Sequence, residues 1–120
     1  MKFCWTTLYV KDMEASLRFY KEVVGLTENR RMASAPGMEI VFLGEGDTQV
    51  ELICSDQKKN ISVGQDISMG FVTDSIERII ELVKEKGYEV HSGPFQPNPH
   101  VKFFYAQDPT GWRIQFVENL

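Results

Sequence analysis

The side chains best suited to chemistry in this chain stand in short apolar segments that are typical of strands. Glu51, in TQVELIC, supplies a carboxylate that could act as a general base or a metal ligand, and Gln115, in DPTGWRIQFVEN, supplies a neutral amide. Trp5, in FCWTTLYV, offers an indole for stacking, and Ser68, in ISMGFVT, offers a hydroxyl. The pattern indicates either acid–base chemistry at Glu51 or ligand binding by an aromatic and polar surface.

Two helical segments lie between these strands and share one plan. DMEASLRFYKEVVGL begins at Asp12 and DSIERIIELVKEKGY at Asp74, and each Asp is expected to be the N-cap that accepts a backbone N–H. Glu77, three residues after Asp74, suggests a capping box. Gly25 and Gly87 are expected just past the helix ends. The apolar residues at helical spacing are Met13, Leu17, Tyr20 and Val24, then Ile76, Ile79, Ile80 and Val83.

Each helix is predicted to follow one strand and precede three more. The strands fall at residues 3–10, 28–34, 39–44 and 48–54 in the first half, and 67–73, 88–93, 101–107 and 112–118 in the second. The segment SGPFQPNPH reads as a loop, with His91 and His100 around it. A repeated β-α-β-β-β order predicts an α+β fold with a mixed sheet, in one domain over residues 1–120 with modules near 1–60 and 65–120.

One face of each strand can be assigned because successive side chains point to opposite sides of a sheet. The internal repeat aligns Trp5 with Ser68 and Glu51 with Gln115, which places these residues on equivalent faces. We predict a ligand-binding surface from the polar and aromatic residues of that face. Its members are Trp5, Thr7, Gln49, Glu51, Ser68, Arg113 and Gln115.

The overall composition excludes several classes of partner. A net charge of −4 and a pI near 5.2 give no electrostatic reason to bind nucleic acid, and the run NRR at residues 29–31 is typical of a solvated strand face. The apolar runs are too short to span a bilayer, and the N-terminus has no signal-peptide pattern. Cys4 and Cys54 are isolated and are expected to be thiols. We therefore predict a cytoplasmic protein without a nucleic-acid or membrane partner.

Taken together and in order, FYKEVVGL, the strand carrying Glu51 and the closing DPTGWRIQFVE resemble the vicinal oxygen chelate superfamily. This superfamily includes glyoxalase I, bleomycin-resistance proteins, fosfomycin-resistance enzymes, methylmalonyl-CoA epimerase and extradiol dioxygenases. The resemblance covers essentially the whole chain. It implies that two βαβββ modules curl into a mixed-sheet cup that a partner subunit often completes, so we expect a homodimer. It does not imply one chemistry.

The resemblance also implies where a metal ion would bind. In glyoxalase-like relatives His or Gln, Glu, His and Glu occupy four positions, and this chain has Trp5, Glu51, Ser68 and Gln115 there. Only Glu51 is a strong ligand, because an indole has no lone pair for a metal, a hydroxyl is a weak neutral donor and an amide is uncharged. We therefore expect no bound divalent metal and no other cofactor.

Three interpretations of this site remain. The first, which we prefer, is metal-free binding of a small organic ligand, as in the drug-sequestering branch that the sequence resembles. The second is a lyase or isomerase of glyoxalase type with Glu51 as the general base, the role that its family counterpart suggests. In the third, Trp5 fills the cup, Glu51 is hydrogen-bonded to Gln115 and Ser68, and no ligand binds.

Overall fold

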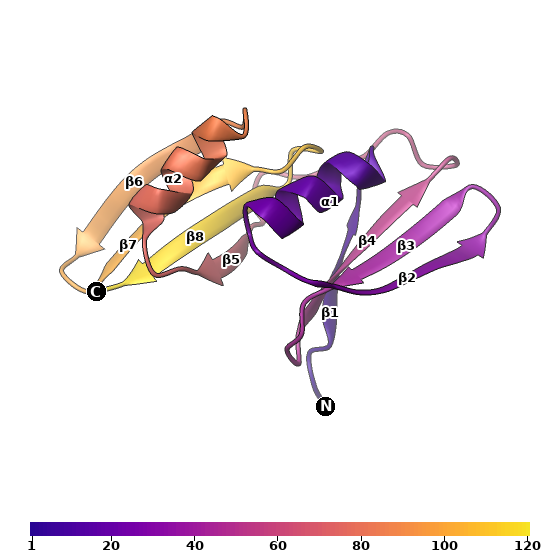
Figure 1. The fold of residues 1–120 in the computed structure, drawn as a ribbon, viewed down its shortest axis with the longest axis horizontal. Helices are drawn as coiled ribbons and strands as arrows, with labels where there is room; N and C mark the ends of the chain where they lie inside the picture. Colours follow the sequence, from indigo (N-terminus) through magenta and orange to yellow (C-terminus); the bar gives the residue numbers. More distant parts are fainter. The chain divides into compact units, whose positions relative to one another are not determined.

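Each half of the chain forms one β-α-β-β-β unit (Figure 1). The computed structural model describes residues 1–120, which divide into the units Met1–Ser62 and Val63–Leu120. The first unit contains β1 (Trp5–Tyr9), α1 (Met13–Glu22), β2 (Glu28–Ala35), β3 (Met38–Leu43) and β4 (Gln49–Ser55). The second contains β5 (Met69–Val72), α2 (Ile76–Glu85), β6 (Val90–Asn98), β7 (Val101–Gln107) and β8 (Arg113–Asn119).

The two units share the same sheet topology. The strand orders are β1-β4-β3-β2 and β5-β8-β7-β6, with one parallel pair in each sheet, β1 with β4 and β5 with β8, and antiparallel pairs elsewhere. The registers also correspond, because Thr7 pairs with Glu51 in the first unit and Gly70 pairs with Gln115 in the second. The predicted α+β class with two βαβββ modules and mixed sheets is therefore confirmed.

The core of each unit lies between the helix and one face of its sheet. In the first unit Leu17 and Tyr20 of α1 are buried, as are Leu8, Val41 and Leu52 of the sheet. In the second, Ile76 and Val83 of α2 and Phe104, Ile114 and Phe116 of the sheet are buried. Burial of alternate strand residues leaves the opposite face of each sheet more exposed. We call this the open face of the unit.

The helix ends agree with the sequence in three of four places. Asp12 caps α1 and accepts from the Ala15 N–H at 3.0 Å. Gly25 and Gly87 follow the helices with φ of 83° and 87°, a region that L-residues with a Cβ seldom occupy. The prediction of Asp74 as the second N-cap was wrong, because Ser75 holds this position and accepts from the backbone N–H three residues on. A one-residue shift between two good capping residues cannot be resolved from capping preference alone.

Glu118 provides a second cap for α2 from a distant strand. Its Oε1 accepts from the Ile76 N–H at 3.0 Å, and the residue is only 9% exposed. Lys102 Nζ lies 3.6 Å from the other carboxylate oxygen and 2.8 Å from Glu77. A helix N-terminus favours negative charge, so this carboxylate fastens α2 to β8.

We expect Glu118→Ala to lower the free energy of unfolding by about 1–3 kcal/mol, because the Ile76 N–H loses its acceptor. Glu118→Gln retains an acceptor oxygen of similar shape and should cost less. Urea denaturation of the two variants measures the difference. Equal stability of the Ala variant and the wild type would show that this carboxylate is not a cap.

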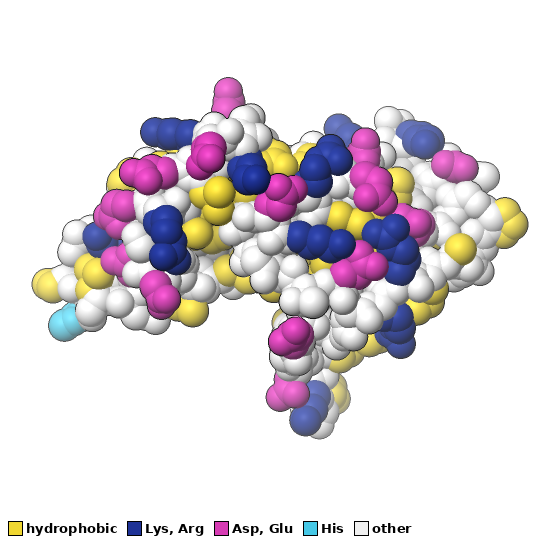
Figure 2. All heavy atoms as spheres, viewed as in Figure 1, with side chains coloured by type: hydrophobic (Ala, Val, Ile, Leu, Met, Phe, Trp, Pro, Cys, Tyr) yellow, Lys and Arg dark blue, Asp and Glu magenta, His cyan; other side chains and the backbone are white.

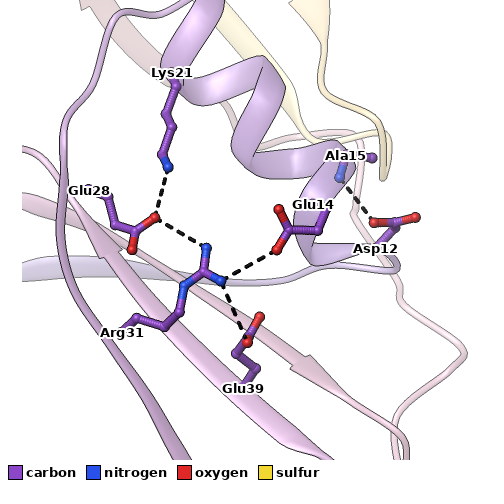
Figure 3. A network of polar contacts seen from close by, with 7 residues as sticks. All are labelled: Asp12, Glu14, Ala15, Lys21, Glu28, Arg31 and Glu39. Atoms are coloured by element: carbon purple, nitrogen blue, oxygen red, sulfur yellow. Dashed lines mark hydrogen bonds and ion pairs between the residues drawn. The ribbon is translucent and has the colours of Figure 1, made fainter.

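The helix side of the first unit carries an ion-pair network centred on Arg31 (Figure 3). Its guanidinium lies 3.2 Å from Glu28, 3.4 Å from Glu14 and 3.9 Å from Glu39, and Lys21 lies 2.8 Å from Glu28. Arg31 is thus part of a defined network that joins α1 to β2 and β3. Around both helices the visible surface intersperses acidic and basic side chains (Figure 2).

The hydrogen bond from Lys21, with help from Arg31, holds the pKa of the Glu28 carboxyl below its ordinary value of 4.5. A lowered folded-state pKa gives stability that is complete above the unfolded-state pKa and is lost as pH falls through the folded-state pKa. Because the Glu28 side chain is 30% exposed, we expect a loss of less than about 1 kcal/mol on acidification below pH 4.5. Stability curves of Glu28→Gln should be flatter over this range, and identical pH slopes would contradict the prediction.

The segment SGPFQPNPH departs from the predicted loop. Residues Val90–Asn98 form β6, the edge strand beside β7, with several register shifts in the pairing. An edge strand needs hydrogen bonds on one side only, so it tolerates Pro94 and Pro97, which obscured the strand pattern. No helix in this structure has the length and hydrophobicity needed to cross a bilayer.

Candidate functional site

The open face of the first unit carries four of the predicted site residues. Trp5 pairs with Gln49 and Thr7 pairs with Glu51 across the parallel strands β1 and β4. The intervening Val50 and Leu52 are buried on the helix side, whereas Trp5 remains 41% exposed. The strand alternation used for the sequence therefore places these four side chains together.

An aromatic and cationic stack adjoins Trp5 on this face. The Trp5 and Phe42 rings meet edge to face with centroids 5.1 Å apart, and the Arg30 guanidinium lies 4.4 Å from the Phe42 centroid. Phe42 pairs with Arg30 on one side and Glu51 on the other. The half-exposed indole thus lies on a supported aromatic surface that can accept a planar molecule.

Glu51 presents an accessible carboxylate at the centre of this face. Its Oε1 accepts a hydrogen bond from the Thr7 hydroxyl, and no lysine or arginine pairs with it. The Thr7 hydroxyl donates its hydrogen bond to Glu51 and thereby orients one carboxylate oxygen. The other oxygen is available to accept a hydrogen bond or a proton from a bound molecule.

Gln115 takes the equivalent place on the open face of the second unit. It pairs with Gly70 of β5 and Tyr105 of β7, and a Cβ at Gly70 would approach the Gln115 Oε1 to 3.4 Å. The missing side chain at Gly70 leaves this amide uncovered. Phe95, Phe103 and Tyr105 extend the face as a row of rings with centroid separations of 5.4 and 5.8 Å.

The turn DPTG fixes the start of β8 and therefore the position of Arg113. The buried Asp108 carboxylate accepts from the backbone N–H groups of Thr110, Gly111 and Trp112 at 2.8–2.9 Å. Arg113 follows at once and donates from Nη1 to the Gln65 carbonyl at 2.9 Å, with its guanidinium 5.9 Å from the Tyr105 ring centroid. Arg113 is held in place from both sides.

Ser68 and the histidines lie in less defined positions. Ser68 is exposed and precedes β5, which begins at Met69, so strand alternation does not assign its face. His91, in β6, contacts its neighbour Ser92 at 3.0 Å. His100 is exposed in the turn after β6, where its N–H donates to the Asn98 side chain at 2.8 Å.

Sequence reasoning missed three residues of these faces, namely Arg30, Phe42 and Tyr105. The two rings lie directly opposite Glu51 and Gln115 in antiparallel pairs, which requires the strand register. The run NRR is exposed on β2 as predicted, and in addition Arg30 covers Phe42 and Arg31 enters an ion-pair network. The internal repeat could have identified the two rings, because it aligns Phe42 with Tyr105 just as it aligns Glu51 with Gln115.

Comparison with models of protein families identifies the family of this chain. The sequence model of the Glyoxalase/Bleomycin resistance protein/Dioxygenase superfamily matches residues 2–116. The chain belongs to this superfamily. The predicted resemblance is therefore confirmed at the level of the family.

Curated relatives within the superfamily have low identity but nearly full coverage. A lactoylglutathione lyase of Neisseria meningitidis is 29% identical over 99% of this chain and 91% of its own length. The uncharacterized protein YwbC of Bacillus subtilis is 27% identical over 95% of this chain and 94% of its own. A lactoylglutathione lyase of Haemophilus influenzae is also 29% identical.

Solved structures share the fold at still lower identity. Glyoxalase I of Zea mays matches with a TM-score of 0.85 and 22% identity over 99% of this chain, which spans about half, 47%, of the maize chain. TnmS3, an antibiotic binding protein from a Streptomyces species, matches with a TM-score of 0.78 and 20% identity over 100% of this chain and 97% of its own. At these identities the likeness concerns the fold.

The residues at the family's metal positions do not fit a divalent cation. The first unit offers Glu51 with the indole of Trp5, and the second offers the Gln115 amide with the Ser68 hydroxyl. No group of three or more His, Cys, Asp or Glu side chains is arranged to hold a metal. Because one carboxylate among neutral groups is a weak ligand set, we assign no step to a metal ion.

Proposed function

We propose that this protein binds a small planar organic molecule on the open face of its first unit without a metal ion. The observation that carries the proposal is the Trp5 indole, 41% exposed and braced by Phe42 on the face that carries Glu51. A large aromatic side chain held rigidly in a half-exposed position gives contact area at a low entropy cost. Stacking against a flat ligand would bury the rest of the indole.

Polar groups around the indole would orient the ligand. Glu51 accepts hydrogen bonds and Thr7 is committed to it, so a donor group on the ligand would meet the free carboxylate oxygen. Gln49 pairs with Trp5 and can donate or accept. This combination of a ring surface with few polar groups is typical of sites that bind small organic molecules. An antibiotic binding protein shares this fold.

A second candidate is a glyoxalase-type lyase or isomerase. Relatives at 29% identity are lactoylglutathione lyases, and Glu51 has an accessible carboxylate that could abstract a proton. The ligand set argues against it, because three of the four family metal positions lack a charged or imidazole group. We therefore favour binding over catalysis.

We also propose that the protein is a homodimer, and we expect a single dimeric species in sedimentation at micromolar concentration. β1 and β2 are edges of the first sheet and β5 and β6 of the second, and such edges tend to pair or be covered. Val72, 71% exposed on β5, and Phe3, 68% exposed before β1, would be covered in a dimer. A monomer at that concentration would contradict the prediction.

Fluorescence of Trp5 provides a direct test of binding. The chain has two tryptophans, so Trp112→Phe leaves Trp5 as the only indole. Planar and cationic aromatic compounds are titrated into this variant, and we expect a saturable change in emission for at least one class. If no compound changes the emission while the variant remains folded, the proposal fails.

A further inference from the structure

The open face of the second unit contains a guanidinium that lacks an anionic partner. Arg113 donates from Nη1 to the Gln65 carbonyl at 2.9 Å and forms no ion pair. Its Nε is buried and donates to no acceptor. Part of this cation is therefore shielded from water without a compensating negative charge, which is unfavourable until an anion approaches.

Two other cations have carboxylate partners, whereas Arg30 and Lys58 lie over the rings of Phe42 and Tyr9. Arg31 lies near three glutamates, and Lys102 lies between Glu77 and Glu118. Arg113 instead lies 5.9 Å from the Tyr105 ring and is fixed by its backbone acceptor. A guanidinium held in this way is fixed in position and keeps Nη2 for a carboxylate.

The neighbouring groups on this face are neutral and can donate hydrogen bonds. The side-chain amide of Gln115, two residues along β8, makes no hydrogen bond within the chain, and its partner Tyr105 carries a free hydroxyl. Gly70 leaves the space beside the Gln115 amide open. The central residues of β7 and β8 on this face include no Asp or Glu that would repel an anion.

Equivalent positions of the two units carry side chains of different charge. The register that places the carboxylate of Glu51 beside Thr7 in the first unit places the amide of Gln115 beside Gly70 in the second. Arg113 corresponds in turn to Gln49, which pairs with Trp5. An anion would be repelled by Glu51 and attracted by Arg113, so the second unit is the better place for it.

We propose that Arg113, with the Gln115 amide and the Tyr105 hydroxyl, binds the carboxylate group of an organic acid. This inference goes beyond the proposed function, since it assigns a second ligand site, on the open face of the other unit. The guanidinium supplies a charged donor from Nη2, and the amide supplies a second donor. The ligand of this site is therefore an aromatic carboxylic acid whose ring can stack on Tyr105 and Phe103 of the same face.

The test compares benzoate with benzamide, which have the same ring and differ in charge. Each is titrated at constant ionic strength, and the NMR signals of the Arg113 Nε–H and the Gln115 side-chain amide are followed. We expect saturable shifts with benzoate and at least a tenfold weaker response to benzamide. Arg113→Met should remove the preference and Arg113→Lys should retain part of it, while Arg18→Met, an exposed arginine on α1, should leave it unchanged.

Equal responses to benzoate and benzamide, no saturable shift at these two groups, or an unchanged preference in a folded Arg113→Met variant would overturn the inference. The proposed function is tested separately, by the change in Trp5 fluorescence when planar compounds are added. If neutral planar compounds change that emission and benzoate shows no preference, only the carboxylate inference fails. If benzoate shifts the Arg113 signal and no compound affects Trp5, the carboxylate site stands and the proposed site at Trp5 fails.

Discussion

The purified protein is expected to turn over the hemithioacetal substrate of lactoylglutathione lyases at least about a thousandfold more slowly than a metal-loaded relative. The reason is the ligand set, in which Glu51 is the single charged donor among the four family metal positions. A Lewis acid contributes several kcal/mol to the stabilisation of charge on substrate oxygens, and about 4 kcal/mol corresponds to a factor of about a thousand. Glu51 and Thr7 alone do not replace that contribution.

The rate should stay low when nickel, zinc or cobalt is added, and a lyase from Neisseria meningitidis measured in parallel provides the positive control. Glu51→Gln should leave the residual rate unchanged if that rate is only background. Metal-stimulated turnover that disappears in Glu51→Gln would show that the protein is an enzyme of this type. The second candidate function would then replace the first.

Trp5→Ala is expected to weaken ligand binding by about tenfold or more, because the ligand loses the ring on which it stacks. Calorimetry measures the affinity, since the variant no longer has the fluorescent reporter. Trp5→Phe keeps a ring against Phe42 and should retain most of the affinity. Glu51→Gln keeps the shape of the site and should weaken binding only for ligands with a donor or positive charge.

Trp112→Phe is the matched control for this loss. Trp112 lies in the turn before β8, where its backbone N–H donates to Asp108, and it is not among the residues of the Trp5 face, so its replacement should leave the affinity unchanged. If Trp5→Ala binds as well as the wild type, or if Trp112→Phe weakens binding equally, then the indole of Trp5 is not part of the site.

Local rules predicted most of the fold. The N-cap at Asp12 and the glycines after each helix follow from the chemistry of helix ends, which involves only a few neighbouring residues. The choice of Ser75 over Asp74 escaped these rules because both residues are good caps. The extra support that α2 receives from Glu118 comes from a strand 42 residues away, and no local pattern encodes it.

The candidate site was predictable to the extent that strand alternation governs it. Period-two alternation was enough to place Trp5, Thr7, Gln49 and Glu51 on one face, because the apolar residues between them mark the buried side. The contribution of Phe42 and Arg30 required the antiparallel registers with β4 and β2, which depend on turn lengths and pairing. Ser68 lies beyond the end of β5, where alternation no longer applies.

The interactions of Arg113 show a different limit. Its type and position were evident in the sequence, but its acceptor at Gln65 lies in the segment before β5 and its ring partner lies on β7. The sequence also could not show that no carboxylate reaches it, since that depends on every neighbouring strand. The lack of a carboxylate partner for Arg113 becomes visible only in the folded unit.

The most direct measurement of the central claim combines metal analysis with binding on one preparation. The protein is dialysed without a chelator, its metal content is determined by plasma mass spectrometry, and the same sample of Trp112→Phe is titrated with planar compounds before and after addition of EDTA. Metal-free binding predicts substoichiometric zinc, nickel and cobalt and a saturable change in Trp5 emission that EDTA does not alter. Stoichiometric metal retained through dialysis, or binding that EDTA abolishes, would contradict the claim.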